Sequence, residues 1–343
     1  MDKDNTINDS TASNIKTDIN NTTKEINQRG TEIQYNSNLE NEAYMLTRRA
    51  ENKLNPGCCL DALFSSKSKR YEDACELYKK AGEKYKVCQQ WRKAGDCFER
   101  CGQIKAKLKE NPTKFYQESF FCYSNGNADN DAKKTFEKMN QYLERDGEFY
   151  QVGKNYENLA KKLENNEQYD EALSYYMKSY AYYEQDGKHE SLKNNIGLKI
   201  AELMLIQNHP DAPTKVPALL ENIGNSCLKN PVTKYSAKDY FGKAVLTAIY
   251  YSNNPSEGSI YINKYKEIDK TFDESTIYNL CCDVINSMEN NNINKLKYSI
   301  QKYKEITEPD NFMIDILNKL EQKASNNIGG VNGNNGGFEE DLK

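Results

Sequence analysis

The stretch Arg70-Tyr-Glu-Asp-Ala-Cys-Glu-Leu-Tyr-Lys-Lys-Ala-Gly-Glu-Lys-Tyr85 carries small or aromatic residues three and four positions apart, at Tyr71, Ala74, Tyr78, Ala81 and Tyr85. This spacing keeps them on one face of an α-helix. The same spacing returns at Tyr169, Ala172, Tyr176, Ser179 and Tyr183, and in shorter form at Trp91, Ala94, Phe98 and Cys101. The sequence therefore predicts one helix design used repeatedly, in which the small residue lets a neighbouring helix approach and the aromatic ring fills the groove beyond it.

The repeat has a regular period. Motifs start at residues 71, 91, 129, 149 and 169, which gives steps of 20, 38, 20 and 20 residues. The step of 38 leaves room for one more helix near Phe115 to Tyr123. Two units of 20 residues make a helical hairpin of about 40, close to the period of helical-repeat solenoids. We predict an all-α fold with a TPR-like series of antiparallel helical hairpins and a helical bundle after it.

Composition divides the chain into four segments. Residues 1–40 are rich in Asn and Thr and too polar to offset the entropy of ordering, so we expect a disordered head. The helical repeats occupy 41–230 and the C-terminal helical bundle 231–325. Residues 326–343 form a flexible Gly/Asn-rich tether and an acidic tail that ends in Leu342 and Lys343.

Glycines and prolines mark the expected breaks between helices. We expect turns at five glycines of the repeat region, namely Gly95, Gly102, Gly126, Gly147 and Gly187. The stretch 208–217 contains three prolines, which predicts a loop.

Charge and hydropathy exclude several classes of protein. Of the 343 residues 37% are apolar and 29% charged, which suits an extended helical array better than a compact globule. The net charge of -4 supplies no overall attraction to nucleic acid or to anionic lipid. No apolar run resembles a signal peptide or reaches the length of a membrane span. We expect a cytoplasmic protein whose ten cysteines are reduced.

Catalytic constellations are missing from the sequence. There is no P-loop and no dinucleotide fingerprint, and the two histidines, His189 and His209, fall in expected loops. Cys97 and Cys101 lie one helical turn apart, but no second pair completes a metal site, so we expect both to be packed in the core. The sequence predicts no enzyme, no cofactor and no metal, and points to a binding surface.

The segment between the first two predicted helices is both apolar and basic. Leu60, Leu63 and Phe64 precede a cationic group at Lys67, Lys69 and Arg70, all expected in a loop. Apolar side chains beside lysines suit a weak contact with a membrane surface. The alternative is that Leu63 and Phe64 fold back onto the first helix pair.

Several stretches, taken in order, carry a family resemblance. They are Tyr71-Glu-Asp-Ala-Cys-Glu-Leu-Tyr78, Lys234-Tyr-Ser-Ala-Lys-Asp-Tyr-Phe241, Phe272-Asp-Glu-Ser275 and the ending Glu339-Glu-Asp-Leu-Lys343. Over roughly residues 42–325 and the tail, the chain resembles the alpha class of soluble NSF attachment proteins, the adaptors of the ATPase called N-ethylmaleimide-sensitive factor.

The resemblance implies a fold, partners and a role. The fold is a TPR-like right-handed solenoid of antiparallel helical hairpins followed by a C-terminal helical bundle. The partners are the assembled SNARE complex, with its syntaxin-type proteins, the NSF ATPase, and a membrane surface met through the apolar loop. The role is that of a non-catalytic, peripherally membrane-bound adaptor for SNARE complex disassembly in vesicle-mediated transport, such as that between the endoplasmic reticulum and the Golgi apparatus.

The resemblance also assigns residues to the SNARE complex. A SNARE-facing lysine of the family matches Lys154, and a second falls on Asn195, with Lys193 two residues away. Glu148 stands where the family has an arginine, and Ser124-Asn-Gly126 replaces a lysine pair. Lost cations should lower affinity for an acidic SNARE surface. Either other lysines are used, or the partner is charged differently.

At the far end, the resemblance assigns residues to the ATPase and the membrane. An acidic group that contacts the ATPase matches Glu289, although its neighbours are Asn286 and Asn290. The penultimate leucine, which stimulates the ATPase in the family, is Leu342. Leu63 and Phe64 match the family's apolar membrane pair, while Cys59-Leu60 replaces an aromatic pair.

Two other readings remain open at the level of sequence. A helical-repeat scaffold of another kind, such as a chaperone cofactor, would bind a peptide in its groove and would need neither Leu342 nor the apolar loop. An enzyme that uses cysteine chemistry would need a thiol with a low pKa.

Overall fold

The computed structural model describes residues 36–56 and 66–331, with side chains described up to residue 326, and these ranges contain no strand. The chain divides after Gly147 into two compact units. In the first unit a helix over residues 36–54 precedes α3 (Lys67–Val87), α4 (Trp91–Lys107), α5 (Thr113–Asn125) and α6 (Asp129–Arg145). The second unit contains α7 (Phe149–Asn165), α8 (Tyr169–Asp186), α9 (Glu190–Ile206), α10 (Ala212–Lys229), α11 (Ala237–Tyr251), α12 (Glu257–Ile268), α13 (Thr276–Glu289), α14 (Ile293–Ile306) and α15 (Asn311–Val331).

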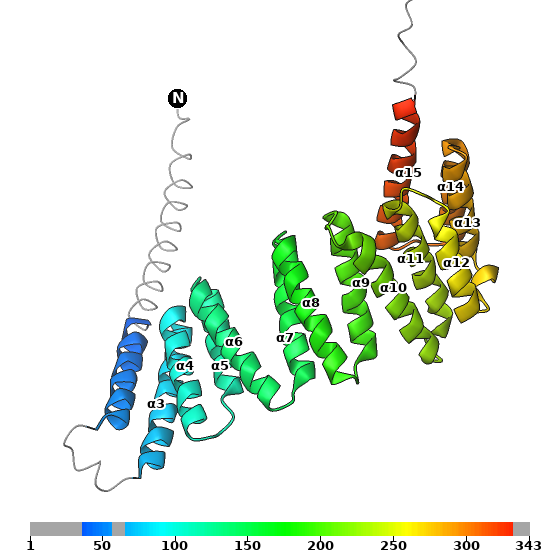
Figure 1. Cartoon of the computed structure of the whole chain (residues 1–343). Helices are drawn as coiled ribbons and strands as arrows, with labels where there is room; N and C mark the ends of the chain where they lie inside the picture. Colours follow the sequence, from blue (N-terminus) through cyan, green and yellow to red (C-terminus); the bar gives the residue numbers. More distant parts are fainter. Residues whose placement is uncertain (1–35, 57–65, 332–343) are drawn as a thin grey trace, which may run out of the picture. The chain divides into compact units, whose positions relative to one another are not determined.

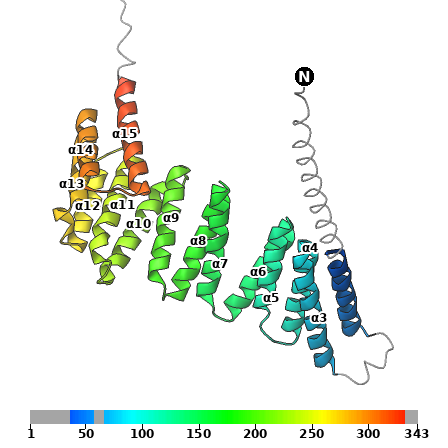
Figure 2. The same cartoon turned by 180° about the vertical axis from the view of Figure 1, so that it is seen from behind.

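The predicted all-α series of helical hairpins is confirmed in both units. Within each unit, consecutive helices pack against each other and run alternately in opposite directions (Figures 1 and 2). The predicted motif starts at Trp91, Asp129, Phe149 and Tyr169 are the first residues of α4, α6, α7 and α8. The hidden helix near Phe115 is α5. The right-handed sense stays a prediction.

The boundary expected between residues 230 and 231 lies within the second unit. One cluster of buried side chains extends there from Ala160 in α7 to Ala324 in α15, so it includes helices on both sides of that point. The division into repeat and bundle stays a prediction.

The stripe of small and aromatic residues forms the contacts between helices, as the spacing indicates. Ala74 and Ala81 of α3 are fully buried, and Tyr78 and Tyr85 are nearly so. Each buried aromatic ring removes about 150–250 Å² from water, which makes the rings the main contributors to helix packing. The stripe therefore stabilises the array, and it leaves the exposed faces to other residues.

Two glycines expected in turns lie inside a helix. Gly95 and Gly102 belong to α4, where the rings of Tyr123 and Tyr116 rest against them. The prediction was wrong because these glycines do not end the helix. Their missing side chains let the rings of α5 pack closely against α4. Turn positions with positive φ are taken by Gly147 and Gly187 as expected, and otherwise by Gln89, Lys109, Asn127, Glu167, Asn208 and Asn291. Gly126 is the residue after α5 and has a negative φ.

Three helix boundaries also differ from the sequence prediction. Helix α3 begins at Lys67, so the cationic group at 67–70 lies on a helix and not in a loop; Ser66 caps this helix by accepting the backbone N–H of Lys69 at 3.2 Å. The first described helix already includes residues 36–40, which belong to the predicted head. Helix α15 continues to Val331, into the predicted tether.

The proline-rich stretch belongs partly to α10 rather than to a loop. Pro213 lies in the first turn, where a backbone N–H has no partner inside the helix, so proline costs nothing there. Pro217 lies inside the helix and removes one backbone hydrogen bond. The helix forms nevertheless, because its apolar face, including Val216, Leu220 and Ile223, is buried.

Substituting Gly95 tests the close contact between α4 and α5. Gly95→Ala would place a Cβ atom 2.6 Å from Cδ1 and Cε1 of Tyr123. At a helical position with free space, replacing glycine with alanine stabilises the protein by about 1 kcal/mol. Forcing an extra methyl group into a packed core instead destabilises it by about 1–3 kcal/mol. We expect a lower free energy of unfolding in urea.

The control for this prediction removes the ring. In a Tyr123→Ala background, Gly95→Ala should stabilise the protein, because the space is then free. A stabilising effect of Gly95→Ala in the wild-type background would contradict the packing described here.

Candidate binding surfaces

Lys154 lies on α7 and forms part of a cluster around a buried carboxylate. The Glu157 side chain is 6% exposed and accepts hydrogen bonds from the Tyr183 hydroxyl at 2.6 Å, from Lys161 Nζ at 2.6 Å and from Lys154 Nζ at 3.2 Å. Burial by itself would raise the pKa of Glu157, but these hydrogen bonds outweigh it, and the pKa is lowered. Glu157 is therefore ionised at neutral pH and holds both lysines.

The two lysines of this cluster remain accessible. The Lys154 side chain is 35% exposed and that of Lys161 is 55% exposed. An ammonium group has three N–H donors, and Lys154 uses one of them on Glu157. Two lysines on one carboxylate leave an excess positive charge, which can attract an acidic partner.

Lys193, the second predicted SNARE residue, is more enclosed. It lies on α9, its side chain is 15% exposed, and it forms an ion pair with Glu190 at 2.8 Å while lying over the ring of Tyr180. Burial would lower the pKa of Lys193, but the hydrogen bond to Glu190 outweighs it and raises the pKa. Lys193 is charged, yet it would have to leave Glu190 to bind a partner fully.

Glu289 is the last residue of α13 and is exposed. Its carboxylate accepts a hydrogen bond from the Ser256 hydroxyl at 2.5 Å, which ties the end of α13 to the turn before α12. Within the part of the chain that is described, no hydrogen bond or ion pair joins Lys154, Lys193 and Glu289 to one another.

The remaining predicted residues lie outside the described ranges. Leu60, Leu63 and Phe64 fall within 57–65, and Leu342 falls within 332–343. Their assignments to the membrane and to the ATPase stay predictions.

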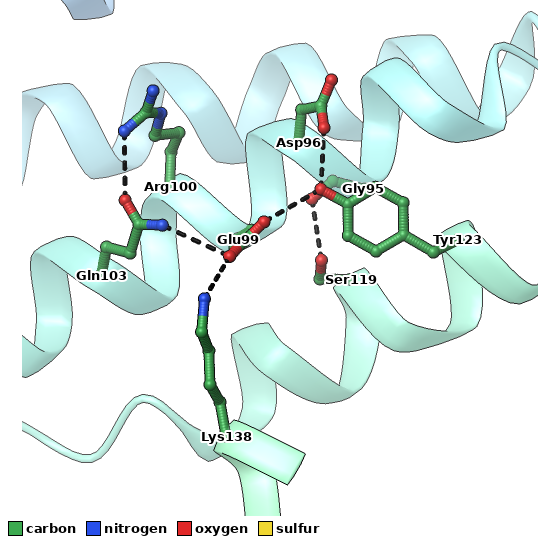
Figure 3. Close-up of polar contacts among 8 residues, drawn as sticks. All are labelled: Gly95, Asp96, Glu99, Arg100, Gln103, Ser119, Tyr123 and Lys138. Carbon is green, nitrogen blue, oxygen red and sulfur yellow. Dashed lines mark hydrogen bonds and ion pairs between the residues drawn. The ribbon is translucent and has the colours of Figure 1, made fainter. Parts of the chain in front are cut away.

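Sequence reasoning missed a polar network between α4, α5 and α6 (Figure 3). The Tyr123 hydroxyl donates to Asp96 Oδ1 at 2.7 Å and is 3.0 Å from Glu99 Oε2, and Lys138 Nζ donates to Glu99 Oε1 at 2.6 Å. The Ser119 hydroxyl donates to the carbonyl oxygen of Gly95 at 2.9 Å. Burial raises the pKa of Tyr123, and the neighbouring carboxylates add to the rise, so the phenol stays protonated.

The second unit repeats this arrangement between α7 and α8. Tyr183 bonds to Glu157, and the Ser179 hydroxyl donates to the carbonyl oxygen of Gly153 at 2.8 Å. Gly153 lies against the ring of Tyr183, as Gly95 lies against that of Tyr123. The shared signal is a glycine four residues before a glutamate on one helix and a serine four residues before a tyrosine on the next, and a comparison of helices could have found it.

Most of the described cysteines are buried, and only Cys88 and Cys282 among them are half-buried. Burial raises the pKa of the Cys97 thiol to about 11 and that of the Cys122 thiol to about 12. In contrast, a hydrogen bond with Cys101 outweighs burial and lowers the pKa of Cys75, but Cys75 is only 4% exposed. Over residues 36–56 and 66–326, no group of side chains is arranged to hold a metal ion, and none of the described helices is long and apolar enough to cross a membrane.

Known proteins resemble this chain along most of its length. The family model "Soluble NSF attachment protein, SNAP" matches residues 41–325. The vesicular-fusion protein SEC17 of Komagataella phaffii is 28% identical, over 81% of this chain and 94% of the relative. The human alpha-soluble NSF attachment protein is 25% identical, over 90% and 99%. A probable vesicular-fusion protein, a sec17 homologue of Neurospora crassa, is 27% identical, over 74% and 87%. The chain therefore belongs to the soluble NSF attachment protein family.

Proposed function

We propose that this chain is an adaptor that binds assembled SNARE complexes and recruits and stimulates the NSF ATPase, which then disassembles them during vesicle-mediated transport and membrane fusion. The observation that carries the proposal is the family match over residues 41–325. The relatives named as vesicular-fusion proteins support it. The chain performs no catalysis itself and acts from the cytoplasm as a peripheral membrane protein.

The SNARE contact involves the basic group on α7. Lys154 and Lys161 are held by Glu157 and keep donors free for acidic side chains on a bundle of syntaxin-type and related helices. Each exposed pair of charges contributes about 0.2–1 kcal/mol, so several such contacts are needed. Lys193 contributes less to SNARE binding than Lys154, because its ammonium group already forms an ion pair with Glu190.

The ATPase contact involves the other end of the chain. Glu289 presents an exposed carboxylate at the end of α13. Leu342 supplies an apolar side chain next to the acidic residues of the tail. Together they provide a charged contact and a stimulating contact for the ATPase.

The membrane contact involves Leu60, Leu63 and Phe64. Apolar side chains enter the boundary between headgroups and acyl chains, while neighbouring lysines meet anionic lipid. Lys67 and Lys69, at the start of α3, supply those cations.

The disassembly reaction tests the function and the role of the tail together. Immobilised SNARE complex is loaded with the full chain or with a chain lacking Leu342 and Lys343, and NSF and ATP are then added. We expect both chains to bind the SNARE complex, but the truncated chain to support slower ATP hydrolysis and slower SNARE release.

Either of two outcomes would count against this account. Failure of the full chain to support release would contradict the adaptor function and favour a helical-repeat scaffold of another kind. Equal ATP hydrolysis with both chains would remove the assignment of Leu342 alone.

Reversing the charge at Lys154 tests the SNARE surface. Lys154→Glu should weaken binding to the SNARE complex, and the loss should shrink as salt is added, because screening weakens exposed charge pairs. Lys215→Glu is the matched control, since Lys215 is also exposed and paired with an acid one turn away, Asp211. Equal losses for the two variants would mean that only net charge matters.

Substituting Phe64 tests the membrane loop. Phe64→Ser should reduce flotation with liposomes that contain anionic lipid, while binding to soluble SNARE complex stays the same. Unchanged flotation would support the alternative in which Phe64 packs against the protein.

A further inference from the structure

The helix over residues 36–54 and α3 form the two walls of an open groove, whose volume is about 760 Å³. Met45 and Leu46 lie in this groove, on a different side of their helix from Ala43 and Ala50, which are buried in the core of the first unit. The Met45 side chain is 60% exposed. The end of a helical array needs a covering element, because its last helix pair has no further neighbour to bury such side chains.

The charges around the groove are not balanced within the described part of the chain. Its three carboxylates each have a lysine nearby, in the pairs Glu42–Lys84 at 2.6 Å, Glu76–Lys80 at 3.8 Å and Glu83–Lys86 at 3.7 Å. Arg49 on one wall and Lys79 on the other line the groove as well, and neither has an acidic partner among residues 36–56 and 66–326. The groove therefore suits a segment that carries apolar side chains next to a carboxylate.

The N-terminal segment of this chain reaches the described structure at one end of the groove. The Cys88 thiol, just after α3, donates to the carbonyl oxygen of Asn36 at 3.4 Å, and Asn41 already lines the groove. Thirty-five residues precede Asn36, and the family match begins only at residue 41. Because these residues are joined covalently to one wall of the groove, their effective concentration there is high.

The sequence of this segment contains an apolar stripe. Ile15, Ile19 and Ile26 are four and seven residues apart. On a helix that turns by about 100° per residue, the three side chains lie within about 40° of one another. No glycine or proline interrupts residues 7–29. So polar a helix is marginal in isolation and needs an apolar surface to pack against, which explains why composition alone predicts disorder.

Acidic residues lie along one flank of this isoleucine stripe. Asp18 and Glu25 are seven residues apart and fall on the same flank, whereas Lys16 and Lys24 fall on other sides of the helix. Gly30 allows the chain to reverse between residues 26 and 36. A helix that returns antiparallel from this turn brings Asp18 level with Arg49, so the unpaired acid meets an unpaired cation.

We propose that residues 15–26 fold back as a helix into the groove between residues 36–54 and α3, with the isoleucine stripe on Met45 and Leu46 and with Asp18 beside Arg49. The segment thus covers the open end of the helical array. This contact within one chain is separate from the predicted SNARE, ATPase and membrane contacts, and it assigns an ordered role to part of the head.

Amide hydrogen exchange of the full-length protein tests whether the stripe occupies the groove. Ile19→Asp places a charge in the stripe, and Asn20→Asp, which adds the same side chain on another side of the helix, is the matched control. We expect Ile19→Asp to speed exchange in fragments that cover residues 41–49 and 76–84 by about tenfold, because an isoleucine no longer buries its apolar surface there. The control should leave this exchange unchanged. Equal exchange in Ile19→Asp and the wild type would overturn the proposal.

A charge exchange tests the register. Asp18→Arg and Arg49→Asp should each speed exchange of the groove by about threefold, because each variant sets like charges side by side. The variant that carries both substitutions restores an opposite pair and should recover most of the protection. No recovery in the double variant would contradict the pairing of Asp18 with Arg49.

Protein concentration distinguishes the head from another occupant. A contact within one chain is independent of concentration, so exchange of the groove should be the same when the protein is diluted a hundredfold. Protection that is lost on dilution would assign the groove to a second copy of the chain and would overturn the proposal.

Discussion

The hydrogen bond from a buried tyrosine to a glutamate on the preceding helix fixes how neighbouring helices sit against each other. Apolar packing alone resists sliding only weakly, because one ring can replace another in a groove. A charge-assisted bond such as that from Tyr183 to Glu157 is directional and holds a single register. Glycine at positions 95 and 153 brings the ring close enough for the bond to form. The carboxylates then attract lysines, so the contacts that align the helices also place cations at their surface.

This arrangement changes how the charges in the sequence should be counted. Several lysines that look available in the sequence are paired with internal acids, including Lys193 with Glu190 and Lys199 with Glu164 and Glu202. Lys154 also has an internal partner, but it keeps part of its surface exposed. The accessible positive surface is therefore smaller than the lysine count suggests. In the proposed function, recognition of an acidic partner would depend on a few lysines held in place, such as Lys154 and Lys161.

Much of the fold could be predicted from the spacing of small and aromatic residues, because the Ala and Tyr residues of the stripe all lie on the buried face of their helix. Helix starts at Trp91, Asp129, Phe149 and Tyr169 followed from the period of 20. The positions of Gly95 and Gly102 inside α4 could not be predicted, because a glycine that admits a ring from another helix looks the same in sequence as one that ends a helix. Pro217 was misassigned for a similar reason: burial of the α10 face outweighs the lost hydrogen bond. Of the candidate sites, Lys154, Lys193 and Glu289 were named from resemblance, whereas the pairing of Glu157 depends on a tyrosine 26 residues away.

A double-mutant cycle between Glu157 and Tyr183 tests the central claim most directly. Tyr183→Phe removes the donor, and Glu157→Met removes the acceptor at similar length. The free energy of unfolding is measured in urea for both single variants and for the double variant. We expect the double variant to lose less stability than the sum of the single losses, by about 1 kcal/mol or more. Losses that add to within about 0.5 kcal/mol would contradict the claim, because the two side chains would then contribute independently to the helix pair.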